Sequence, residues 1–557
     1  MLLHFSTIQK TLSRSGLLSA VILLSAHSPL RSEEVLYNGI RLPADGPPKR
    51  ALTRKPMPLP YLEHRPDVIP IDVGRQLFVD DFLVASTTLQ RRFHQPEMHP
   101  GNPVIRRDKA WEGLTAIPFS DGVWYDPQAR IFKAWYQCAR DTCYATSTDG
   151  IEWQKTALDV VPGTNIVLKG PRDSSTVWFD LEEKDASRRY KMLSFSQPRN
   201  EHAIAFRASA DGIHWSDPIG RGRTFKLPNF DRTTMFFNPF RQLWIYSVRG
   251  SNVGPKAFPD LDDSMGRVRY YLETKDFARG WESRDELTPW VGADERDLPD
   301  PQIKLPAQLY NMDAVAYESL MLGLFCVWRG PDNKEVTDRS KRNEIFLGFS
   351  RDGFHWDRPN RQPFIGVSER RGDWNWGNVQ SVGGGCLIAR DKLYFYFSGR
   401  KGNPDKLPGV NPDSGSSTGL ATLRRDGFAS MDATKRGMLQ TRPVRFTGKH
   451  LFVNANTAQG DLRVEVLDAA GRVIKPFTAA KCERVSADST IQHITWKDAA
   501  DLGKLSGQAV SFRFRIRKGS LYSFWVSPDA SGASYGYVAA GGPGFVGPRD
   551  TVGMTSR

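Results

Sequence analysis

The chain has 557 residues, 39% of them hydrophobic and 25% charged, which is the composition of a soluble globular protein too long for a single ordinary core. Five cysteines in this length exclude a scaffold held together by disulfides. The net charge of +14 would suit an acidic partner such as nucleic acid or a sulfated or uronic polysaccharide. The basic residues, however, occur in short pairs with acids between them, which is typical of a solvated surface, so nucleic acid is not the expected partner.

The first 32 residues predict a signal peptide. Lys10 and Arg14 precede an apolar run over residues 16–26, and small residues follow it. The run is too short to span a bilayer, so we expect a secreted or periplasmic protein with no stable membrane span after cleavage. An uncleaved anchor is the alternative. Residues 33–69 are rich in proline and predict an extended arm.

A seven-residue motif that recurs along the chain predicts the fold. Ser-x-Asp-Gly-(Ile/Phe)-x-Trp occurs at residues 147–153, 209–215 and 350–356, and degenerate copies surround Asp276 and Asp426. Asp-Gly between two extended runs predicts a hairpin with a type I′ turn, and we expect the tryptophan to cover that turn. The aspartates recur at intervals of 62, 65, 76 and 74 residues, which is typical of a repeat architecture.

Two aromatic, β-rich runs precede each hairpin, which makes four strands per unit and five units. The aromatic, Gly- and Pro-rich composition agrees with an all-β fold. We therefore predict a five-bladed β-propeller over residues 70–432. Residues 433–530 alternate apolar and polar positions between glycine turns and predict an antiparallel β-sandwich. The Gly-rich residues 531–557 predict a disordered tail.

The cysteines and histidines predict no metal site. Cys138 and Cys143 flank a predicted turn and are placed to pair locally, whereas Cys326 and Cys386 lie in apolar strands and are expected to be buried thiols. Zinc-ligand spacings, an HExxH motif and a phosphate-binding loop are all missing from the sequence. We expect no cofactor; a structural calcium ion remains an alternative that no ligand loop supports.

Five blades, a signal peptide, a C-terminal sandwich and an acid near most inner strands resemble the five-bladed glycoside hydrolases of families 32, 43 and 68. The stretch PRDSSTVWFD at 171–180 is similar to their Arg-Asp-Pro motif, with Arg172 and Asp173 in place and Ser174 where proline is usual. The repeat differs from the Asp box of sialidases, which has a residue between Asp and Gly. The resemblance implies three catalytic acids on three inner strands, acting as nucleophile or base, transition-state stabiliser and general acid.

The resemblance also implies roles for single residues. Asp173 would be the stabilising carboxylate, with Arg172 binding substrate beside it. The proton donor would be one of the other candidate acids, which are Asp231, Glu112 and Glu318. Candidate sugar-stacking side chains are Trp111, Trp374 and Trp376. The structural alternatives are a capped turn for Arg172-Asp173 and packing between blades for the tryptophans.

The sequence therefore predicts an exported glycoside hydrolase that acts on a poly- or oligosaccharide. The stretch TAIPFSDGVWYD has no acid before Asp121, where the first inner strand of the family carries an aspartate. This departure keeps open a carbohydrate-binding or scaffold propeller without turnover. A polyanion-binding protein is a third alternative, which the net charge alone supports.

Overall fold

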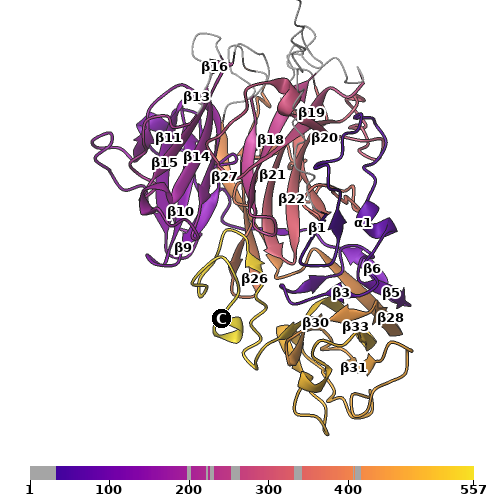
Figure 1. Ribbon diagram of the computed structural model, residues 1–557. Helices are drawn as coiled ribbons and strands as arrows, with labels where there is room; N and C mark the ends of the chain where they lie inside the picture. Colours follow the sequence, from indigo (N-terminus) through magenta and orange to yellow (C-terminus); the bar gives the residue numbers. More distant parts are fainter. Residues whose placement is uncertain are drawn as a thin grey trace, which may run out of the picture.

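The computed structural model describes residues 33–196, 202–220, 224–225, 231–251, 264–331, 341–405, 407 and 415–556 (Figure 1). The signal peptide predicted over residues 1–32 lies outside the described residues. Within these ranges, none of the helices has the length and apolar character needed to cross a bilayer. Strands dominate, and in the described part of the chain the only α-helix is the one-turn α1 (Pro60–Glu63).

Five antiparallel sheets surround a common axis, so the predicted five-bladed propeller is confirmed (Figure 1). The first blade contains β8 (Ala116–Ile117), β9 (Val123–Asp126), β10 (Ile131–Cys138), β11 (Asp141–Ser147) and β12 (Ile166–Leu168). The second contains β13 (Arg172–Phe179), β14 (Tyr190–Ser196), β15 (His202–Ser209) and β16 (Thr224–Phe225). The third contains β17 (Thr234–Asn238), β18 (Leu243–Ser251), β19 (Arg267–Thr274) and β20 (Thr288–Gly292).

The fourth and fifth blades each take one strand from a distant part of the chain. The fourth contains β21 (Gln308–Glu318), β22 (Leu320–Trp328), β23 (Asn343–Ser350) and the C-terminal β34 (Tyr537–Val538). The fifth contains β24 (Asn378–Gln380), β25 (Leu387–Ala389), β26 (Lys392–Arg400), β27 (Ser416–Arg424) and the early strand β7 (Glu97–Met98). The ring is therefore closed by an N-terminal strand, which the repeat did not predict.

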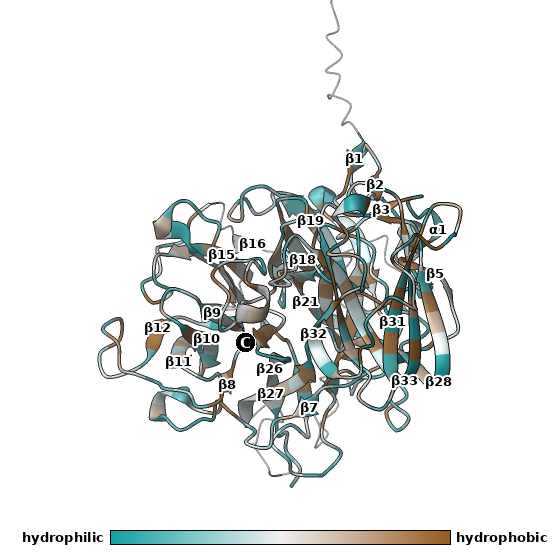
Figure 2. Cartoon of the chain, turned by 90° about the horizontal axis from the view of Figure 1, so that it is seen from below, coloured by the Kyte–Doolittle hydropathy of each residue, from teal (hydrophilic) through white to brown (hydrophobic). Residues whose placement is uncertain are grey.

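The C-terminal residues are ordered, so the predicted disordered tail is wrong. Strand β34 pairs with the last residues of β21, Tyr317 and Glu318. Just beyond it, Tyr125 of the first blade donates its backbone N–H to Ala540, and Ile388 of the fifth blade donates to Gly541. The segment thus bridges three blades and closes one end of the axis, where the C-terminus lies in the view from below (Figure 2). Long-range backbone pairing orders a segment whose composition alone favours disorder.

Each Asp-Gly turn follows the third strand of its blade, so the turns are equivalent, but they are not of type I′. A type I′ turn needs a positive φ at both central residues. In the turns of the first, second and fourth blades the aspartate lacks it, and only the glycine has a positive φ, of 77° at Gly150, 79° at Gly212 and 81° at Gly353. The carboxylate of Asp149 instead accepts the N–H groups of the next two residues after the glycine, and the hydroxyl of Ser147, the first residue of the motif, accepts the N–H of Gly150. The other two copies repeat these bonds. Side-chain hydrogen bonds therefore define the turn.

Aromatic side chains of the neighbouring blade bind these turns. Trp135 of the first blade donates its indole N–H to the carbonyl of Gly212 at 2.7 Å. Tyr396 of the fifth blade likewise donates to Gly150 at 2.6 Å, and Trp290 of the third blade donates to Phe354 at 2.7 Å. The repeat thus fixes each turn against the preceding blade, rather than only folding one hairpin.

The C-terminal domain is an eight-stranded antiparallel sheet that begins before the predicted boundary at residue 433. Its strands are β4 (Gln76–Leu77), β5 (Val84–Thr87), β6 (Gln90–Phe93), β28 (Ala429–Thr441), β30 (His450–Asn456), β31 (Asp461–Leu467), β32 (Asp488–Ile494) and β33 (Ser511–Ser527). Three of these strands come from residues 76–93, which were assigned to the propeller. Leu36, Ile40 and Tyr61 of the proline-rich arm are buried in the same core, so the arm is packed rather than free.

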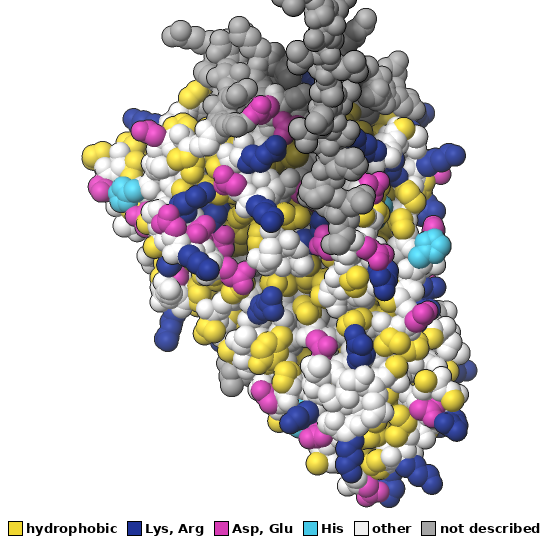
Figure 3. Space-filling model, in the orientation of Figure 1, with side chains coloured by type: hydrophobic (Ala, Val, Ile, Leu, Met, Phe, Trp, Pro, Cys, Tyr) yellow, Lys and Arg dark blue, Asp and Glu magenta, His cyan; other side chains and the backbone are white. Residues whose placement is uncertain are grey.

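Short elements complete the fold. They are β1 (Glu34–Val35) with β2 (Arg41–Leu42), β3 (Ile69–Pro70) with β29 (Val444–Arg445), and the 3-10 turns η1 (Ala110–Glu112), η2 (Ala186–Arg188), η4 (Arg284–Glu286), η5 (Gly503–Leu505) and η6 (Gly553–Ser556). Cys138 and Cys143 form a disulfide, whereas Cys326 and Cys386 are buried thiols. Basic and acidic side chains are interspersed over the face shown in Figure 3, as predicted for a solvated surface.

Candidate functional site

Polar side chains gather where the inner strands begin, at the end of the axis opposite the C-terminal segment. The inner strands contact one another in a ring, as the bridge between Ser120 and Thr176 and the packing of β17 on β21 show. We call this group the axial cluster; its members are Asp121, Arg172, Asp173, Asp231, Arg232, Arg249, Arg269, Tyr310 and Asp313. Blades one to four contribute to it.

Asp121 and Arg172 form a buried ion pair between the first and second blades. Nη2 of Arg172 lies 2.7 Å from Oδ2 of Asp121, and Ser175 donates its hydroxyl to the other carboxylate oxygen. Burial raises the pKa of Asp121 in spite of the favourable charge of Arg172. Arg172 therefore contacts Asp121 rather than Asp173, its neighbour in the predicted motif.

Asp173 is the most exposed carboxylate of the cluster, with 34% of its side-chain surface accessible. Its Oδ1 lies 3.5 Å from Nη2 of Arg232, whose guanidinium stacks over Phe119 at 4.0 Å from the ring centre. The backbone N–H of Arg232 donates to Ser174, the residue that replaces the proline of the family motif. The second blade thus presents a carboxylate toward solvent beside a buried cation.

Asp231 and Arg249 form the corresponding ion pair of the third blade. Behind them lies Arg269, which is wholly buried and donates to the backbone carbonyls of Arg232 at 2.7 Å and Tyr310 at 3.3 Å. Burial, together with the charge of Arg249, lowers the pKa of Arg269 to about 9. The third blade therefore supplies mainly positive charge.

Asp313 is a buried carboxyl group in the middle of β21. Its Oδ2 accepts the N–H of Val382 at 3.0 Å and the amide of Asn311 at 3.2 Å. Burial raises its pKa to about 6, although these hydrogen bonds and the charge of Arg269 oppose the shift. Asp313 can thus hold a proton close to neutral pH.

Tyr310 lies in the same strand, three residues before Asp313. Burial alone would raise the pKa of its phenol, yet the charges of Lys341, Arg232 and Arg267 lower it to about 8. A tyrosine whose pKa falls on burial reports a strongly positive surrounding.

The structure brings Asp173, Arg172 and Asp231 together but places Glu112 elsewhere. Glu112 is the last residue of η1, and its side chain caps that turn by accepting the N–H groups of Asp108 and Lys109. The remaining oxygen accepts the hydroxyl of Tyr136 at 2.8 Å and pairs with Lys155 at 2.6 Å. Both oxygens of the Glu112 carboxylate are thus occupied by structural partners, which leaves its catalytic role a prediction without support from this arrangement.

Glu318 lies at the end of β21 that pairs with the C-terminal segment. It ends β21 with a φ of +51° and is buried between Arg425 at 3.0 Å and Arg75 at 3.4 Å. Ser534 of the C-terminal segment donates its hydroxyl to the same carboxylate at 2.7 Å. Glu318 therefore joins the propeller to the terminal segments, and its catalytic role stays a prediction that these contacts do not support.

The candidate tryptophans have packing roles. Trp111 donates its indole N–H to Asn165 at 2.8 Å. Trp374 packs on Phe397 and lies over two glycines of the fifth blade, where a Cβ at Gly399 would come within 2.2 Å of the indole. Trp376 is buried beneath the guanidinium of Arg371. These contacts support the alternative that the tryptophans pack within and between blades.

Sequence reasoning did not single out Asp121, Asp313, Tyr310 or Arg232. One signal was available for Asp313, because an acid directly before the apolar residues 314–316 of an inner strand needs a reason to be there. Arg232 follows Asp231 directly, but its φ of +58° and its stacking on Phe119 depend on the fold.

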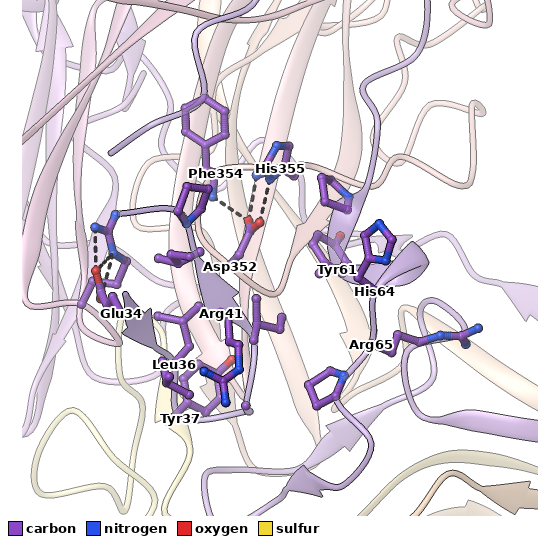
Figure 4. Close-up of a pocket in the computed structure, with 18 of the residues that line it drawn as sticks. Glu34, Leu36, Tyr37, Arg41, Tyr61, His64, Arg65, Asp352, Phe354 and His355 are labelled. Carbon is purple, nitrogen blue, oxygen red and sulfur yellow. Dashed lines mark hydrogen bonds and ion pairs between the residues drawn. The ribbon is translucent and has the colours of Figure 1, made fainter. Parts of the chain in front are cut away.

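A separate groove lies between the proline-rich arm and the fourth blade (Figure 4). Its volume is about 1090 Å³, and its lining includes Tyr37, His64 and the turn around Asp352. The Asp352 carboxylate accepts from the N–H of Phe354 and pairs with His355, while Glu34 pairs with Arg241. Two of the acids that line the groove, Asp352 and Glu34, thus have structural partners. Across the described ranges no group of three or more His, Cys, Asp or Glu side chains is arranged to hold a metal ion.

Neither a family model nor a curated protein matches the chain. Solved structures that resemble it include one described for the GH130 family of mannoside phosphorylases, with 12% identity and a TM-score of 0.41 over 64% of this chain and 99% of the other. A glycosyl hydrolase from Bacteroides ovatus has 14% identity and a TM-score of 0.40 over 63% and 97%. A fructofuranosidase from Schwanniomyces occidentalis, complexed with fructosylnystose, has 9% identity and a TM-score of 0.37 over 78% and 98%. The function must therefore be argued from the axial cluster itself.

Proposed function

We propose that the protein is a carbohydrate-active enzyme, a glycoside hydrolase that cleaves a poly- or oligosaccharide at the axial cluster. One observation supports the proposal: two carboxyl groups on different inner strands, Asp173 at the start of β13 and Asp313 within β21, lie in contrasting environments. Asp173 is ion-paired and partly exposed, whereas Asp313 is buried with a pKa of about 6. Two carboxyl groups with diverging pKa values are what acid-base cleavage of a glycosidic bond requires.

The roles follow from these environments. Asp313 would give its proton to the glycosidic oxygen as the bond between that oxygen and the anomeric carbon breaks. Asp173 would stabilise the positive charge that develops on the sugar ring, and water would complete the hydrolysis. Asp231 is held in an ion pair by Arg249, so the donor role that the sequence gave to Asp231, Glu112 or Glu318 passes in this proposal to Asp313.

A non-catalytic binding propeller is the second candidate. The observation that favours it is that Asp121, Asp173 and Asp231 are each paired with an arginine, as structural acids are. The two candidates predict different outcomes for one experiment, because a binding protein holds a saccharide without releasing reducing ends.

We further propose that the protein is exported. The charged and apolar pattern of residues 1–32 supports this, and so does the disulfide between Cys138 and Cys143, since disulfides persist mainly in oxidising compartments. Cell fractionation of the natural producer tests it, and protein confined to the reducing cytosol would contradict it.

The test of activity is a reducing-end assay of the purified protein against a polysaccharide panel, with Asp173→Asn as the variant. The substitution keeps the shape but removes the charge, so turnover should fall by a factor on the order of 10² while folding is retained. Asp159→Asn, in a highly exposed carboxylate of the first blade, is the matched control and should leave turnover unchanged. Equal turnover of wild type and Asp173→Asn would refute the proposed role.

A further inference from the structure

One part of the C-terminal sheet has an apolar inner face and a basic outer face. Strand β33 lies between β28 and β31 in this sheet (Figure 2). The inward side chains are buried and apolar, and they occupy alternate positions of the three strands: Leu439, Leu462, Val464, Phe512, Phe514 and Ile516. Because successive side chains of a strand point to opposite faces, the residues between them point outward.

Arginines dominate these outward positions. They are Arg436 in β28, Arg463 in β31, and Arg513, Arg515 and Arg517 in β33, and we call these five side chains the arginine face. The acids within residues 436–440, 461–465 and 511–517 are Asp461 and Glu465. Five guanidinium groups against two carboxylates leave an excess of three positive charges on one flat surface.

The strand register places like charges directly opposite one another. Arg436 pairs with Arg517 across β28 and β33, and Arg463 pairs with Arg515 across β31 and β33. Arg436 is also exposed, and it has no acidic partner among the described residues. Like charges at directly opposite positions destabilise a sheet. An anionic ligand on this face would offset that cost.

The two acids are shared between arginines and leave guanidinium donors accessible. Oε2 of Glu465 lies 2.9 Å from Nε of Arg515 and 3.3 Å from Nη1 of Arg513. Oδ2 of Asp461 lies 2.8 Å from Nη2 of Arg517. Arg515 and Arg517 nevertheless keep 51% and 38% of their side-chain surface accessible. Their remaining N–H groups can therefore reach a ligand from solvent.

We propose that the arginine face binds an acidic polysaccharide, a chain that carries carboxylate or sulfate groups along its length. Guanidinium groups bind the oxygens of both groups through parallel N–H donors. Arg513, Arg515 and Arg517 alternate along one strand, so they follow one another at intervals of about 7 Å. Such a row suits a polymer with repeated charges better than a single small anion. The face lies outside the axial cluster, so the inference goes beyond the proposed function.

The side chains between the arginines favour a polysaccharide over a nucleic acid. Proteins that bind single-stranded nucleic acid stack its bases on aromatic side chains. The other outward positions of residues 436–440, 461–465 and 511–517 hold Met438, Gln440 and Ser511 beside the two acids, and none of these is aromatic. Double-stranded DNA would offer its phosphates to the same arginines, so it enters the test as the competing polyanion.

The test measures the binding of dextran sulfate and of polygalacturonate by titration calorimetry or affinity electrophoresis, with neutral dextran as the control. At least one acidic polymer should bind and dextran should not, and the affinity should fall as salt is raised. Failure of both acidic polymers to bind would overturn the inference. Tighter binding of double-stranded DNA than of both polymers would overturn it as well.

Variants separate the arginine face from the net charge of the chain. The face variant combines Arg436→Gln, Arg515→Gln and Arg517→Gln. The control variant removes the same charge from exposed arginines elsewhere: Arg41→Gln, Arg370→Gln and Arg472→Gln. The face variant should bind the acidic polymer about tenfold more weakly or worse, since charge-assisted bonds are lost, whereas the control variant should bind as the wild type does. Equal losses in the two variants would show that net charge alone is responsible and would overturn the assignment.

A second measurement needs no variant. Phenylglyoxal modifies accessible arginines, and mass spectrometry identifies the modified positions. Bound dextran sulfate should protect Arg436 and Arg515, while Arg370 should react as it does in the free protein. Unchanged modification of Arg436 and Arg515 under saturating polymer would overturn the assignment.

The readouts distinguish this inference from the proposed function. Asp173→Asn should bind the acidic polymer as the wild type does, because the axial cluster is a different site. If the polymer binds at the arginine face and no saccharide is cleaved, the hydrolase proposal fails and the arginine face stands. Loss of polymer binding in Asp173→Asn would place the polymer at the axis and overturn the inference.

Discussion

At the scale of residues, the candidate acids of this chain differ in their hydrogen-bond partners and in their exposure to solvent. Glu112 and Glu318 have every oxygen occupied by a structural donor, whereas Asp173 keeps a third of its side-chain surface accessible. Asp313 is buried in the middle of a strand and so favours its neutral form. The sequence shows that acids lie near inner strands, but desolvation depends on neighbours that only the fold assembles.

Asp313 should make both stability and activity depend on pH. Its pKa rises from 3.8 to about 6 on folding, so the folded state binds the proton more tightly than the unfolded state does. The stabilisation is complete below about pH 4 and is lost as the pH rises through 6, with a total on the order of 2–3 kcal/mol. Hydrolysis should fall over the same range above pH 6, because the donor loses its proton.

Asp313→Asn is the variant that tests this. Urea unfolding between pH 4 and 8 should lose the corresponding slope, and turnover should fall at every pH. A wild-type pH slope that persists in the variant would assign the titration to another group.

At the scale of elements, the repeat predicted the place of the turns after the third strands correctly, but the type I′ geometry was wrong and the partners of the turns were not predicted. The Ser-x-Asp-Gly pattern locates each turn because its hydrogen bonds are local. The sequence does not show that Trp135 binds the turn of the next blade, since that contact depends on how two blades pack. Strand β7 was missed for the same reason, because its partner β27 lies more than 300 positions away.

The role of an acid on an inner strand depends on whether it lies at the start or at the end of that strand. Glu318 was chosen because it lies on the fourth inner strand. Asp126, Asp180 and Asn238 lie at or just beyond the ends of the first three inner strands, where a polar side chain serves the turn to the next strand. Glu318 occupies the equivalent position in β21. The sequence pattern that favours a structural role for Glu318 was therefore present.

Gly212→Ala should destabilise the propeller. The residue has a φ of +79°, and a Cβ there would come within 2.4 Å of Cζ2 of Trp135. Strain and overpacking together should lower the free energy of unfolding by about 2–4 kcal/mol. Gly163→Ala has the same φ of +79° with no atom within 4 Å of its Cβ, so it isolates the backbone contribution. Chemical denaturation measures both, and equal losses would show that the contact with Trp135 contributes nothing.

At the scale of the whole molecule, one buried ionic network joins regions that the domain boundaries separated. Arg75 pairs with Asp426 at 3.1 Å and stacks on Trp525, while Arg425 pairs with Glu318 and with Asp550 at 2.9 Å. The network thus links an early strand, two blades, the C-terminal sheet and the terminal segment. The sequence could not show it, because its members are up to several hundred residues apart.

Asp550→Asn should destabilise the full chain strongly. Both Asp550 and Arg425 are buried, and removing one partner leaves a buried guanidinium with a weaker counter-charge, which costs on the order of 3 kcal/mol. Asp468→Asn, in an ion pair whose arginine is largely exposed, should leave the unfolding midpoint unchanged. Thermal unfolding compares the two, and equal midpoints would show that the terminal segment does not contribute to the fold through this pair.

Two blades of the propeller are each completed by a strand that is far in sequence from the rest of the blade. Strand β7, at residues 97–98, completes the fifth blade, and β34, at residues 537–538, completes the fourth. A chain emerging from a ribosome or a translocation channel can therefore build separate hairpins, but the fourth blade stays incomplete until residues 537–538 have arrived. Completion of these two blades thus requires contacts between residues far apart in the sequence, which form slowly. Until they form, the unpaired sheet edges need protection, for example by a chaperone, against pairing with other chains.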